Sequence, residues 1–260
     1  MIKISQILLT TIVLLFSTIG FSQTLDLGVL SSFESYTGSG AVTNSGTFTG
    51  DVGTNDGAIT GFVAPSFTGT IHNSNALTAQ ARIDILRVYI HLSDIFVTHP
   101  STHVPAFGGG ETITSGVYST AGAGSVGGTL TLDGGGDSDA VFIIKFDGAF
   151  AVGAGSMIVL SNGTRAANVF WISEGDISVG AASTIKGTLF SDGGAITLGP
   201  NCNIEGRVFA SEGAIAIGAG SVAAIPAGPV TIPINCTDNC AAPAPAVDVL
   251  GSIENFTLFT

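Results

Sequence analysis

Charged side chains are scarce in this sequence. Lys, Arg, Asp and Glu together make up 10% of its 260 residues, which argues against an architecture of long surface helices rich in Glu, Lys and Arg. Basic residues are the scarcest, with 7 Lys and Arg against 19 Asp and Glu and a formal net charge of −12. Nucleic acids and anionic membranes are bound through Lys and Arg, so neither is an expected partner. An all-β or repeat architecture is favoured.

Cysteine and histidine are also few. The cysteines are Cys202, Cys236 and Cys240, and their spacing lacks the second pair that a zinc site needs. The four histidines are scattered, which favours ordinary helix-side and loop positions: His72, His91, His99 and His103. No metal or other cofactor is expected. We expect Cys236 and Cys240 to form a disulfide, leaving Cys202 unpaired.

Long hydrophobic runs are confined to the first residues. The stretch from Ile7 to Ile19 follows Lys3 and ends at small and polar residues. It is shorter than the roughly 20 residues that span a bilayer, so residues 1–22 are predicted to be a secretory signal peptide. The mature protein is therefore expected to be secreted or held at the cell surface, without a membrane-inserted segment.

Glycine, by contrast, is abundant, with 37 residues, and it belongs to a repeat. A motif of a small residue, an aliphatic residue, Gly and another small residue occurs at 125–128, 151–154, 178–181, 197–200 and 216–219. The last three copies are 19 residues apart, and other columns align at that offset: 171, 190 and 209; 183, 202 and 221; 185 and 204; 177, 196 and 215. Such columns predict stacked coils of three short strands each, a three-sided β-solenoid.

Alternation within each coil predicts which side chains point inward. Ile177 and Val179 flank Ser178, and the same pattern recurs around Thr197 and Ala216, so the aliphatic residues are expected inside and the small ones outside. The aromatic column of Trp171, Phe190 and Phe209 is expected to stack in the core. Another strand of the coil is expected to carry Lys186, Glu205 and Arg207 outward, forming a solvated face with Lys186 beside Glu205.

One segment departs from the β pattern. Apolar residues recur at helical spacing from Ala76 to about Val97, at 77, 81, 85, 86, 89, 92 and 96, and predict an amphipathic helix packed on the outer wall of the solenoid. Ser74 and Asn75 are the candidate N-caps, and Pro100 follows the helix.

The C-terminal part changes composition. Residues 229–247 are rich in Pro and Ala and are predicted to be a semi-rigid linker. Residues 250–260 resemble residues 27–37, with Leu, Gly, Phe and Thr in register. Residues 248–260 are therefore expected to begin a second copy of the solenoid domain, which itself spans residues 23–228.

Several separated motifs occur in a fixed order, at 27–33, 59–62 followed by 68–72, 115–118, 130–133 followed by 139–143, 168–171 and 206–210. In these motifs and in their order the chain resembles the widespread microbial ice-binding protein family. The resemblance covers Leu27 to about Ala224. It implies a right-handed β-solenoid with one long helix along it, the N-terminal coils preceding the helix and the others following it.

The resemblance also implies a function and a site. Ice contacts in this family are attributed to a flat face with loosely repeated Thr-Ala/Gly-x-Thr/Asn motifs, and the matching positions here are Ser125, Ala151, Ala154, Ser178, Ala181, Thr197, Ala216 and Ala219. Only Thr197 keeps a Thr, which predicts weaker activity, although small apolar residues also order water. The expected partner is the ice crystal surface, and the expected activity is antifreeze or inhibition of ice recrystallisation. The alternative is an adhesion or carbohydrate-surface-binding module without ice activity.

Catalytic and calcium-binding interpretations are weaker. The Asp-rich loop at 133–139 lacks calcium-loop spacing and occurs once, which favours a Gly-rich turn. Among Glu174, Asp176, Asp192 and Glu212, only Glu174 and Glu212 are expected to share a column, and no basic or aromatic surround indicates a sugar site. The chain is therefore expected not to be an enzyme. A monomer is expected, with the coil after Val222 as an exposed end.

Overall fold

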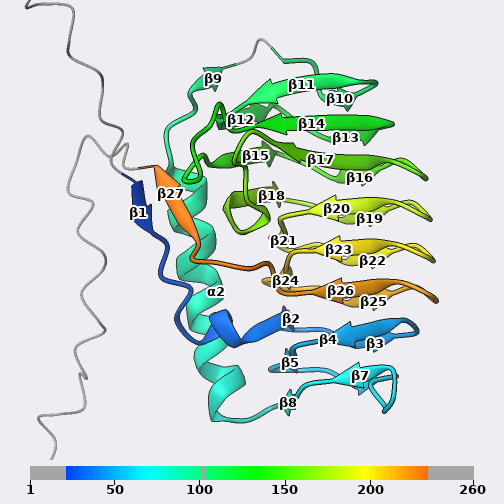
Figure 1. Ribbon diagram of the computed structural model, residues 1–260. Helices are drawn as coiled ribbons and strands as arrows, with labels where there is room; N and C mark the ends of the chain where they lie inside the picture. The colour runs from blue at the N-terminus through cyan, green and yellow to red at the C-terminus, as the bar shows by residue number, and fades with distance from the viewer. Residues whose placement is uncertain (1–21, 101–102, 234–260) are drawn as a thin grey trace, which may run out of the picture.

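Three parallel β-sheets form the three sides of a solenoid in the computed structural model of this chain, which describes residues 22–100 and 103–233. Successive coils stack along one axis, and one long helix lies along the outside of the stack (Figure 1). The predicted fold class, a three-sided right-handed β-solenoid with one helix packed along it, is confirmed.

Each coil passes through the three sheets in a fixed order. Sheet I is the side next to the helix, and its nine strands are, in spatial order, β8 (Ile71–Asn73), β5 (Asp51–Thr54), β2 (Phe33–Thr37), β24 (Val208–Ala210), β21 (Thr188–Ser191), β18 (Val169–Ser173), β15 (Phe142–Phe146), β12 (Gly116–Thr120) and β9 (His99–Pro100). Sheet II has eight strands, β10 (Ala106–Gly108), β13 (Gly124–Gly127), β16 (Phe150–Val152), β19 (Ile177–Val179), β22 (Ile196–Leu198), β25 (Ile215–Ile217), β3 (Val42–Asn44) and β6 (Ile59–Thr60).

Sheet III also has eight strands. They are β11 (Glu111–Thr114), β14 (Thr129–Asp133), β17 (Met157–Ser161), β20 (Thr184–Lys186), β23 (Asn203–Glu205), β26 (Val222–Ala224), β4 (Thr47–Thr49) and β7 (Phe67–Thr68). Two short 3-10 helices, η1 (Gly28–Ser32) and η2 (Ala166–Asn168), precede β2 and β18. The long helix is α2 (Ala76–Asp94).

The last coil stacks on the first. Helix α2 carries the chain from one end of the stack to the other, and the later coils then return until β26 pairs with β4 through Val222 and Thr47. In sheet II, β25 likewise pairs with β3. The expectation that the coil after Val222 is an exposed end is therefore wrong, because the N-terminal coil covers it. In the described part of the chain, β6, β7 and β8 close one end of the stack and β9, β10 and β11 the other.

Two buried ionisable side chains, Glu34 and Arg207, lie at this junction. Glu34 is the extra residue at a register shift where β2 pairs with β5, and its side chain is fully buried without a hydrogen-bond partner among the described residues. Arg207, from the last coil, is also buried, and its Nη2 donates to the Ser31 carbonyl. Burial holds the pKa of the Glu34 carboxyl well above its ordinary value, and the nearby Arg207 guanidinium partly opposes that shift.

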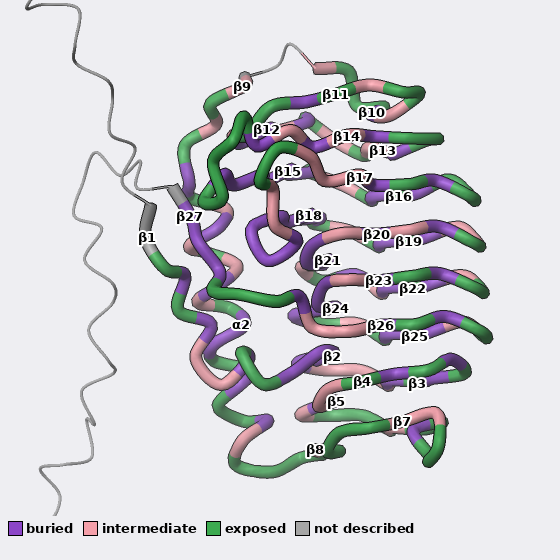
Figure 2. Tube along the Cα trace, viewed as in Figure 1, coloured by how far each residue is buried: buried purple, intermediate pink, exposed green. Residues whose placement is uncertain are grey.

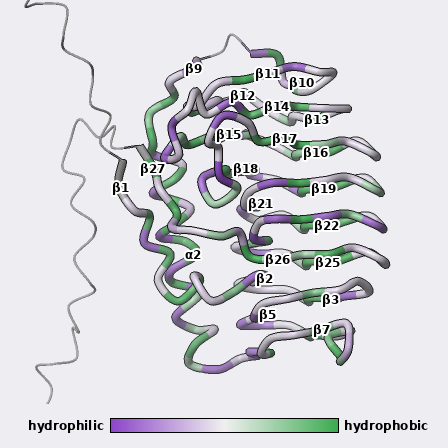
Figure 3. Tube along the Cα trace, in the orientation of Figure 1, coloured by the Kyte–Doolittle hydropathy of each residue, from purple (hydrophilic) through white to green (hydrophobic). Residues whose placement is uncertain are grey.

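Two hydrophobic cores lie on the two sides of sheet I (Figure 2). Inside the solenoid, the rings of Phe150 and Trp171 stack with centroids 5.4 Å apart, and Phe146 stacks on Phe150 at 4.4 Å. Between sheet I and α2, Phe190 and Phe209 pack with Ile85 and the other buried residues of the helix. Hydrophobic segments recur from coil to coil along the strands (Figure 3), as the predicted alternation requires.

The expected aromatic column is only partly present. Strand β21 pairs with β18 at an offset of 18 residues, so Phe190 lies beside Ile172 and Trp171 lies beside Leu189. Phe190 and Phe209 do pair, but they face α2 rather than the solenoid interior. The prediction failed because the 19-residue period that holds in sheet II shortens by one residue at this point of sheet I.

Helix α2 is capped at both ends by side chains. Asn75 is the N-cap: its side chain accepts from the Thr78 backbone N–H, and the Thr78 hydroxyl accepts from the Asn75 N–H. At the other end, the buried Lys145 of β15 donates to the carbonyl oxygens of Ser93 and Ile95 at 2.6 and 2.7 Å. Unpaired carbonyls at a helix C-terminus attract a cation in this way.

The buried face of α2 differs in part from the predicted stripe. Ala81, Ile85 and Leu92 are buried as expected. Leu86 and Phe96, which the spacing placed in the stripe, are 45% and 70% exposed. Phe96 lies beyond the end of the helix, and Leu86 lies on its outer side.

The described chain ends meet beside α2. Strands β1 (Ser22–Thr24) and β27 (Thr231–Pro233) form an antiparallel pair, and Val230 and Ile232 are buried in the core beneath the helix. The predicted disulfide of Cys236 and Cys240, residues 1–21 of the predicted signal peptide, residues 234–247 of the predicted linker and residues 248–260 lie outside the described residues. Within the described ranges, no helix combines the length and apolarity needed to cross a membrane.

Candidate functional site

A single column of small side chains runs along the outside of sheet II. Strand pairing places one outward residue of each coil directly beside the next, and the central residues are Ser178, Thr197 and Ala216. The full column, in spatial order, is Ala106, Ser125, Ala151, Ser178, Thr197, Ala216, Thr43 and Thr60. All eight are exposed or half-buried, and none is charged. Neighbouring strands of a sheet are about 4.8 Å apart, so the column is a regular row.

The structure places the predicted site residues in two adjacent rows. Five of them, Ser125, Ala151, Ser178, Thr197 and Ala216, belong to the strand column. The other three, Ala154, Ala181 and Ala219, lie at the corner that leads from sheet II to sheet III. Backbone bonds link this corner from coil to coil, as from Gly155 N–H to Ala181 and from Asn201 N–H to Ala219.

Sequence reasoning missed three members of the column. Thr43 and Thr60 belong to coils that precede α2, and they extend the column because the last coil stacks on the first. Ala106 extends it at the other end. A local signal was present: Ala41, Val42 and Thr43 repeat the pattern of Ala214, Ile215 and Ala216. Comparison at the 19-residue offset did not find this similarity, because the coils before α2 and the coils after it are not related by that offset.

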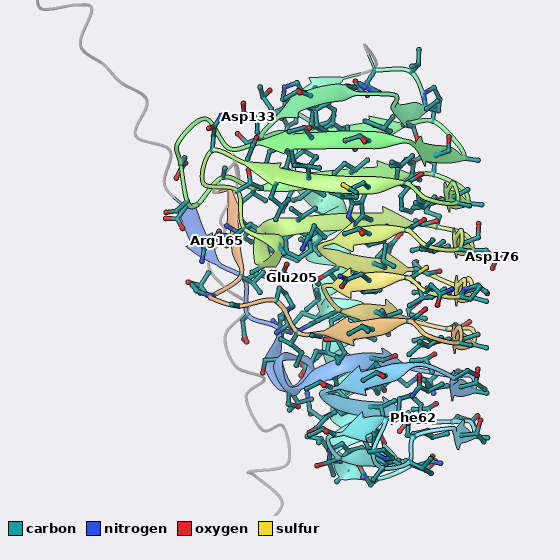
Figure 4. All side chains as sticks on the ribbon, turned by 45° about the vertical axis from the view of Figure 1, so that its right-hand side comes forward. Phe62, Asp133, Arg165, Asp176 and Glu205 are labelled. Atoms are coloured by element: carbon teal, nitrogen blue, oxygen red, sulfur yellow. The ribbon has the colours of Figure 1, made fainter. Side chains whose placement is uncertain are left out.

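A second row flanks the column on the other side. This row consists of the corner residue that precedes each strand of sheet II, and backbone hydrogen bonds connect these corners from coil to coil. Its members are Ala149, Asp176, Ala195, Ala214, Ala41 and Ala58. Asp176 is the charged member of this row (Figure 4), and its Oδ1 accepts from the Ala195 backbone N–H at 2.8 Å. One carboxylate therefore lies within this row, and the exposed Asp56, Asp147, Glu174 and Glu212 lie two residues before members of the row, farther from the column.

Buried polar side chains hold the corner between sheets II and III in place. Ser183 donates to the carbonyls of Gly153 and Gly180, and Cys202 and Ser221 continue the same inward ladder in the next two coils. Cys202 is a free, buried cysteine. A Cβ at Gly180 would lie 2.4 Å from the Ala154 backbone nitrogen, so the coils approach too closely there for any side chain. The coils are therefore closely stacked at this corner, and inward hydrogen bonds fix its backbone.

Sheet III presents a different outer surface. Lys186 and Glu205 lie side by side as predicted, with Nζ 2.6 Å from Oε2. Exposed Thr residues occur on the same side, at 47, 49, 68, 112, 114 and 129. The prediction that Arg207 points outward with this pair is wrong, because Arg207 is 6% exposed and turned toward the junction with the first coil.

The carboxylates considered for catalysis are not paired as expected. Ser173 pairs with Ser191, which aligns Glu174 with Asp192 rather than placing it in the column of Glu212. Asp192, Glu212 and Arg82 line a shallow pocket of about 270 Å³ beside α2. Asp192 accepts a hydrogen bond from Ser211.

The Asp-rich loop is closed by its own hydrogen bonds. Asp133 accepts from Gly135 N–H and from the Asn162 amide, which lowers the pKa of its carboxyl. Arg165, labelled in Figure 4, pairs with Asp139 at 2.9 Å. In residues 22–100 and 103–233, no three His, Cys, Asp or Glu side chains are grouped so as to hold a metal ion.

Comparison with known proteins gives consistent matches. Residues 36–223 match the model of a family described as Ice-binding-like. An ice-binding protein from Nostoc sp. (strain HG1) is 33% identical over 168 residues, 64% of this chain and 61% of the relative.

Two solved structures also resemble this fold. The ice-binding protein from an Antarctic bacterium, Flavobacteriaceae, has a TM-score of 0.74 at 36% identity, covering 79% of this chain and 48% of that one. The ice-binding protein from the Antarctic ascomycete Antarctomyces psychrotrophicus has a TM-score of 0.72 at 28% identity, covering 79% of this chain and 100% of that one. This chain thus spans less than two thirds of the Nostoc relative and about half of the bacterial structure.

Proposed function

This chain belongs to the ice-binding-like family, and from that premise we propose that it is an ice-binding protein whose outer surface on sheet II adsorbs to ice. The observation that carries the proposal is the uncharged column from Ala106 to Thr60, in register over eight strands. Adsorption of this kind involves no catalytic step and no cofactor. Antifreeze activity or inhibition of ice recrystallisation follows from it.

The chemistry of the surface supports this choice of side. Charged groups keep their own hydration shells, whereas small apolar groups leave the adjacent water free to adopt an ordered layer. Sheet III carries Lys186 and Glu205, and sheet I is covered by α2. Sheet II has the longer uncharged column open to solvent, over eight strands, whereas the uncharged column of sheet III runs over six strands from Thr129 to Thr47 and lies beside the Lys186–Glu205 pair.

Threonine is concentrated at one end of the column. Thr43, Thr60 and Thr197 lie within four successive strands, with Ala216 between them. Each Thr places a hydroxyl beside a methyl group, so it fixes a water molecule and leaves an apolar neighbour. We therefore assign the stronger ice contacts to this end of the column. The alanines and serines toward β10 are assigned weaker ice contacts.

We further propose that the protein acts outside the cell, as a secreted or surface-held monomer. The predicted signal peptide supports export. A surface-held protein of this kind would also attach a cell to ice, and a tandem copy would raise the avidity for a repeating surface.

Uptake into a growing ice hemisphere tests the proposal. Fluorescently labelled residues 23–260 are expected to be incorporated, and T197E is expected to be excluded because it places a carboxylate in the centre of the column. N203E is the matched control, since Asn203 is exposed at the same depth of the stack but on sheet III. Exclusion of the unmutated protein would remove the function and favour an adhesion or carbohydrate-binding role. Loss of uptake by N203E alone would transfer the site to sheet III.

A further inference from the structure

Two outward rows run side by side along sheet II, and only one of them is free of charge. Each corner residue before a strand lies two positions ahead of the column member in that strand, as Ala195 does before Thr197. Residues two apart in an extended segment face the same side, about 6.6 Å apart. We call the row of corner residues the leading row; its members are Ala149, Asp176, Ala195, Ala214, Ala41 and Ala58.

Asp176 interrupts the leading row between Ala149 and Ala195. Its side chain is exposed at the outer margin of its coil (Figure 4). The hydrogen bond from the Ala195 N–H to its Oδ1, at 2.8 Å, directs the carboxylate toward the next coil. None of the ion pairs among the described residues includes Asp176. An unneutralised carboxylate is therefore held in a fixed position on this surface.

On one side of Asp176 the two rows form an array without charge. It extends over β22, β25, β3 and β6, and every member is exposed or half-buried. Its strands are about 4.8 Å apart and its rows about 6.6 Å apart. We call these eight residues the uncharged block: Ala195, Ala214, Ala41 and Ala58 in the leading row, and Thr197, Ala216, Thr43 and Thr60 in the column.

A carboxylate at the border of the uncharged block changes what the surface can order. Removing a charged group from liquid water is costly, so the water around Asp176 stays bound to its carboxylate and does not join an ordered layer. The longer side chain also rises above the neighbouring alanines. Ice that lies against the uncharged block therefore meets an obstacle at β19, the strand that follows Asp176.

We infer that Asp176 sets the limit of the ice-binding surface. This inference rests on the proposed function and identifies the residue that determines how many strands contact ice. Contact is confined to the uncharged block, and the rows beyond Asp176, toward β16, stay apart from ice. Asp176 acts by its charge and not by its hydrogen bond to Ala195.

Replacing the carboxylate separates these two roles. D176N keeps an oxygen that accepts from the Ala195 N–H but removes the charge, whereas D176A removes both. Uptake of the labelled protein into an ice hemisphere is expected to rise by roughly twofold or more in both variants, because the surface extends past β19. A purely structural role predicts no gain for D176N and a loss for D176A.

E174Q is the matched control for charge. Glu174 is exposed and lies two residues before Asp176, in the bend of the same coil. The substitution removes the same charge from the same coil but leaves the leading row unchanged. Its uptake is expected to equal that of the unmutated protein.

Charges placed on the two sides of Asp176 test the limit itself. Ala214 and Ala149 are both exposed members of the leading row, the first inside the uncharged block and the second beyond Asp176. A214E is expected to lower uptake by roughly fivefold or more. A149E is expected to change it little in the unmutated protein but to remove the gain in D176N, and this coupling shows that Asp176 divides the surface.

The outcomes distinguish this inference from the proposed function. Exclusion of the unmutated protein and of every variant from ice would remove the function and the inference together. Uptake of the unmutated protein with no gain in D176N over E174Q would overturn the inference alone. Equal losses in A149E and A214E would also overturn it, because contact would then extend on both sides of Asp176.

Discussion

Lys145 offers a direct test of how the helix is fixed to the solenoid. The Lys145 side chain extends from sheet I toward α2 through the second core. Its ammonium group donates to two backbone carbonyl oxygens at the C-terminal end of α2. The residue is 9% exposed, and burial lowers the pKa of its ammonium group. K145M keeps the length and apolar stem of the side chain but removes the charge and both hydrogen bonds.

The expected loss of stability is the balance of opposing effects. Each hydrogen bond to a charged donor stabilises by about 1.5–3 kcal/mol, and the two carbonyls would lose their partner. Removing the charge also relieves its desolvation, which offsets part of the loss. We expect K145M to lower the free energy of unfolding by about 2–4 kcal/mol, equivalent to roughly 4–16 °C in Tm for a domain of this size.

Urea unfolding followed by circular dichroism measures this difference. K186M is the control, because Lys186 is a partly exposed member of a surface ion pair, and such pairs contribute about 0–1 kcal/mol. If K145M lost no more stability than K186M, Lys145 would not cap α2 and the reasoning would be refuted. Slower hydrogen exchange at the last turn of α2 in the unmutated protein than in K145M would locate the effect at the helix terminus.

Two further predictions concern the junction and the core. Because the pKa of Glu34 is higher in the folded protein than in the unfolded chain, the folded state retains that proton as pH rises above about 4.5, and stability falls until the pH passes the folded pKa. Urea midpoints from pH 4 to 8 are expected to fall in the unmutated protein relative to E34Q, and parallel profiles would contradict this. W171A is expected to cost about 3–5 kcal/mol in thermal or urea unfolding, because Trp171 is fully buried between coils; a cost below 1 kcal/mol would show that the core collapses around the cavity.

The sequence predicted what depends on local repetition. The 19-residue offset is constant through β19, β22 and β25, so the inward aliphatic residues and the outward Ser178, Thr197 and Ala216 were assigned correctly. Ser74 and Asn75 were the two predicted N-cap candidates, and the structure has Asn75, whose side chain accepts from the Thr78 backbone N–H. These features arise from contacts within one coil or between neighbouring coils.

What escaped prediction depends on contacts between distant parts of the chain. Thr43 lies beside Ala216 although 173 residues separate them in sequence, and no periodicity crosses α2. The inward turn of Arg207 depends on Ser31 and Glu34 of the first coil. A single shortened coil, in which Phe190 pairs with Ile172, was enough to move two aromatic residues from one core to the other.

The length of α2 sets the length of the proposed ice-binding surface. The helix leads from β8 at one edge of sheet I to β9 at the other, and the nine strands of that sheet have eight spacings between them. At about 4.8 Å per spacing this distance is about 38 Å. The 19 residues of α2 cover about 28 Å, and the four residues 95–98 add up to about 13 Å. The helix and its connection therefore match the height of the stack. The coils that follow α2 fill the space between β9 and β2, so the length of the helix fixes how many of these coils fit. When that space is filled, the last coil meets the first, and Thr43 and Thr60 join one column with Thr197.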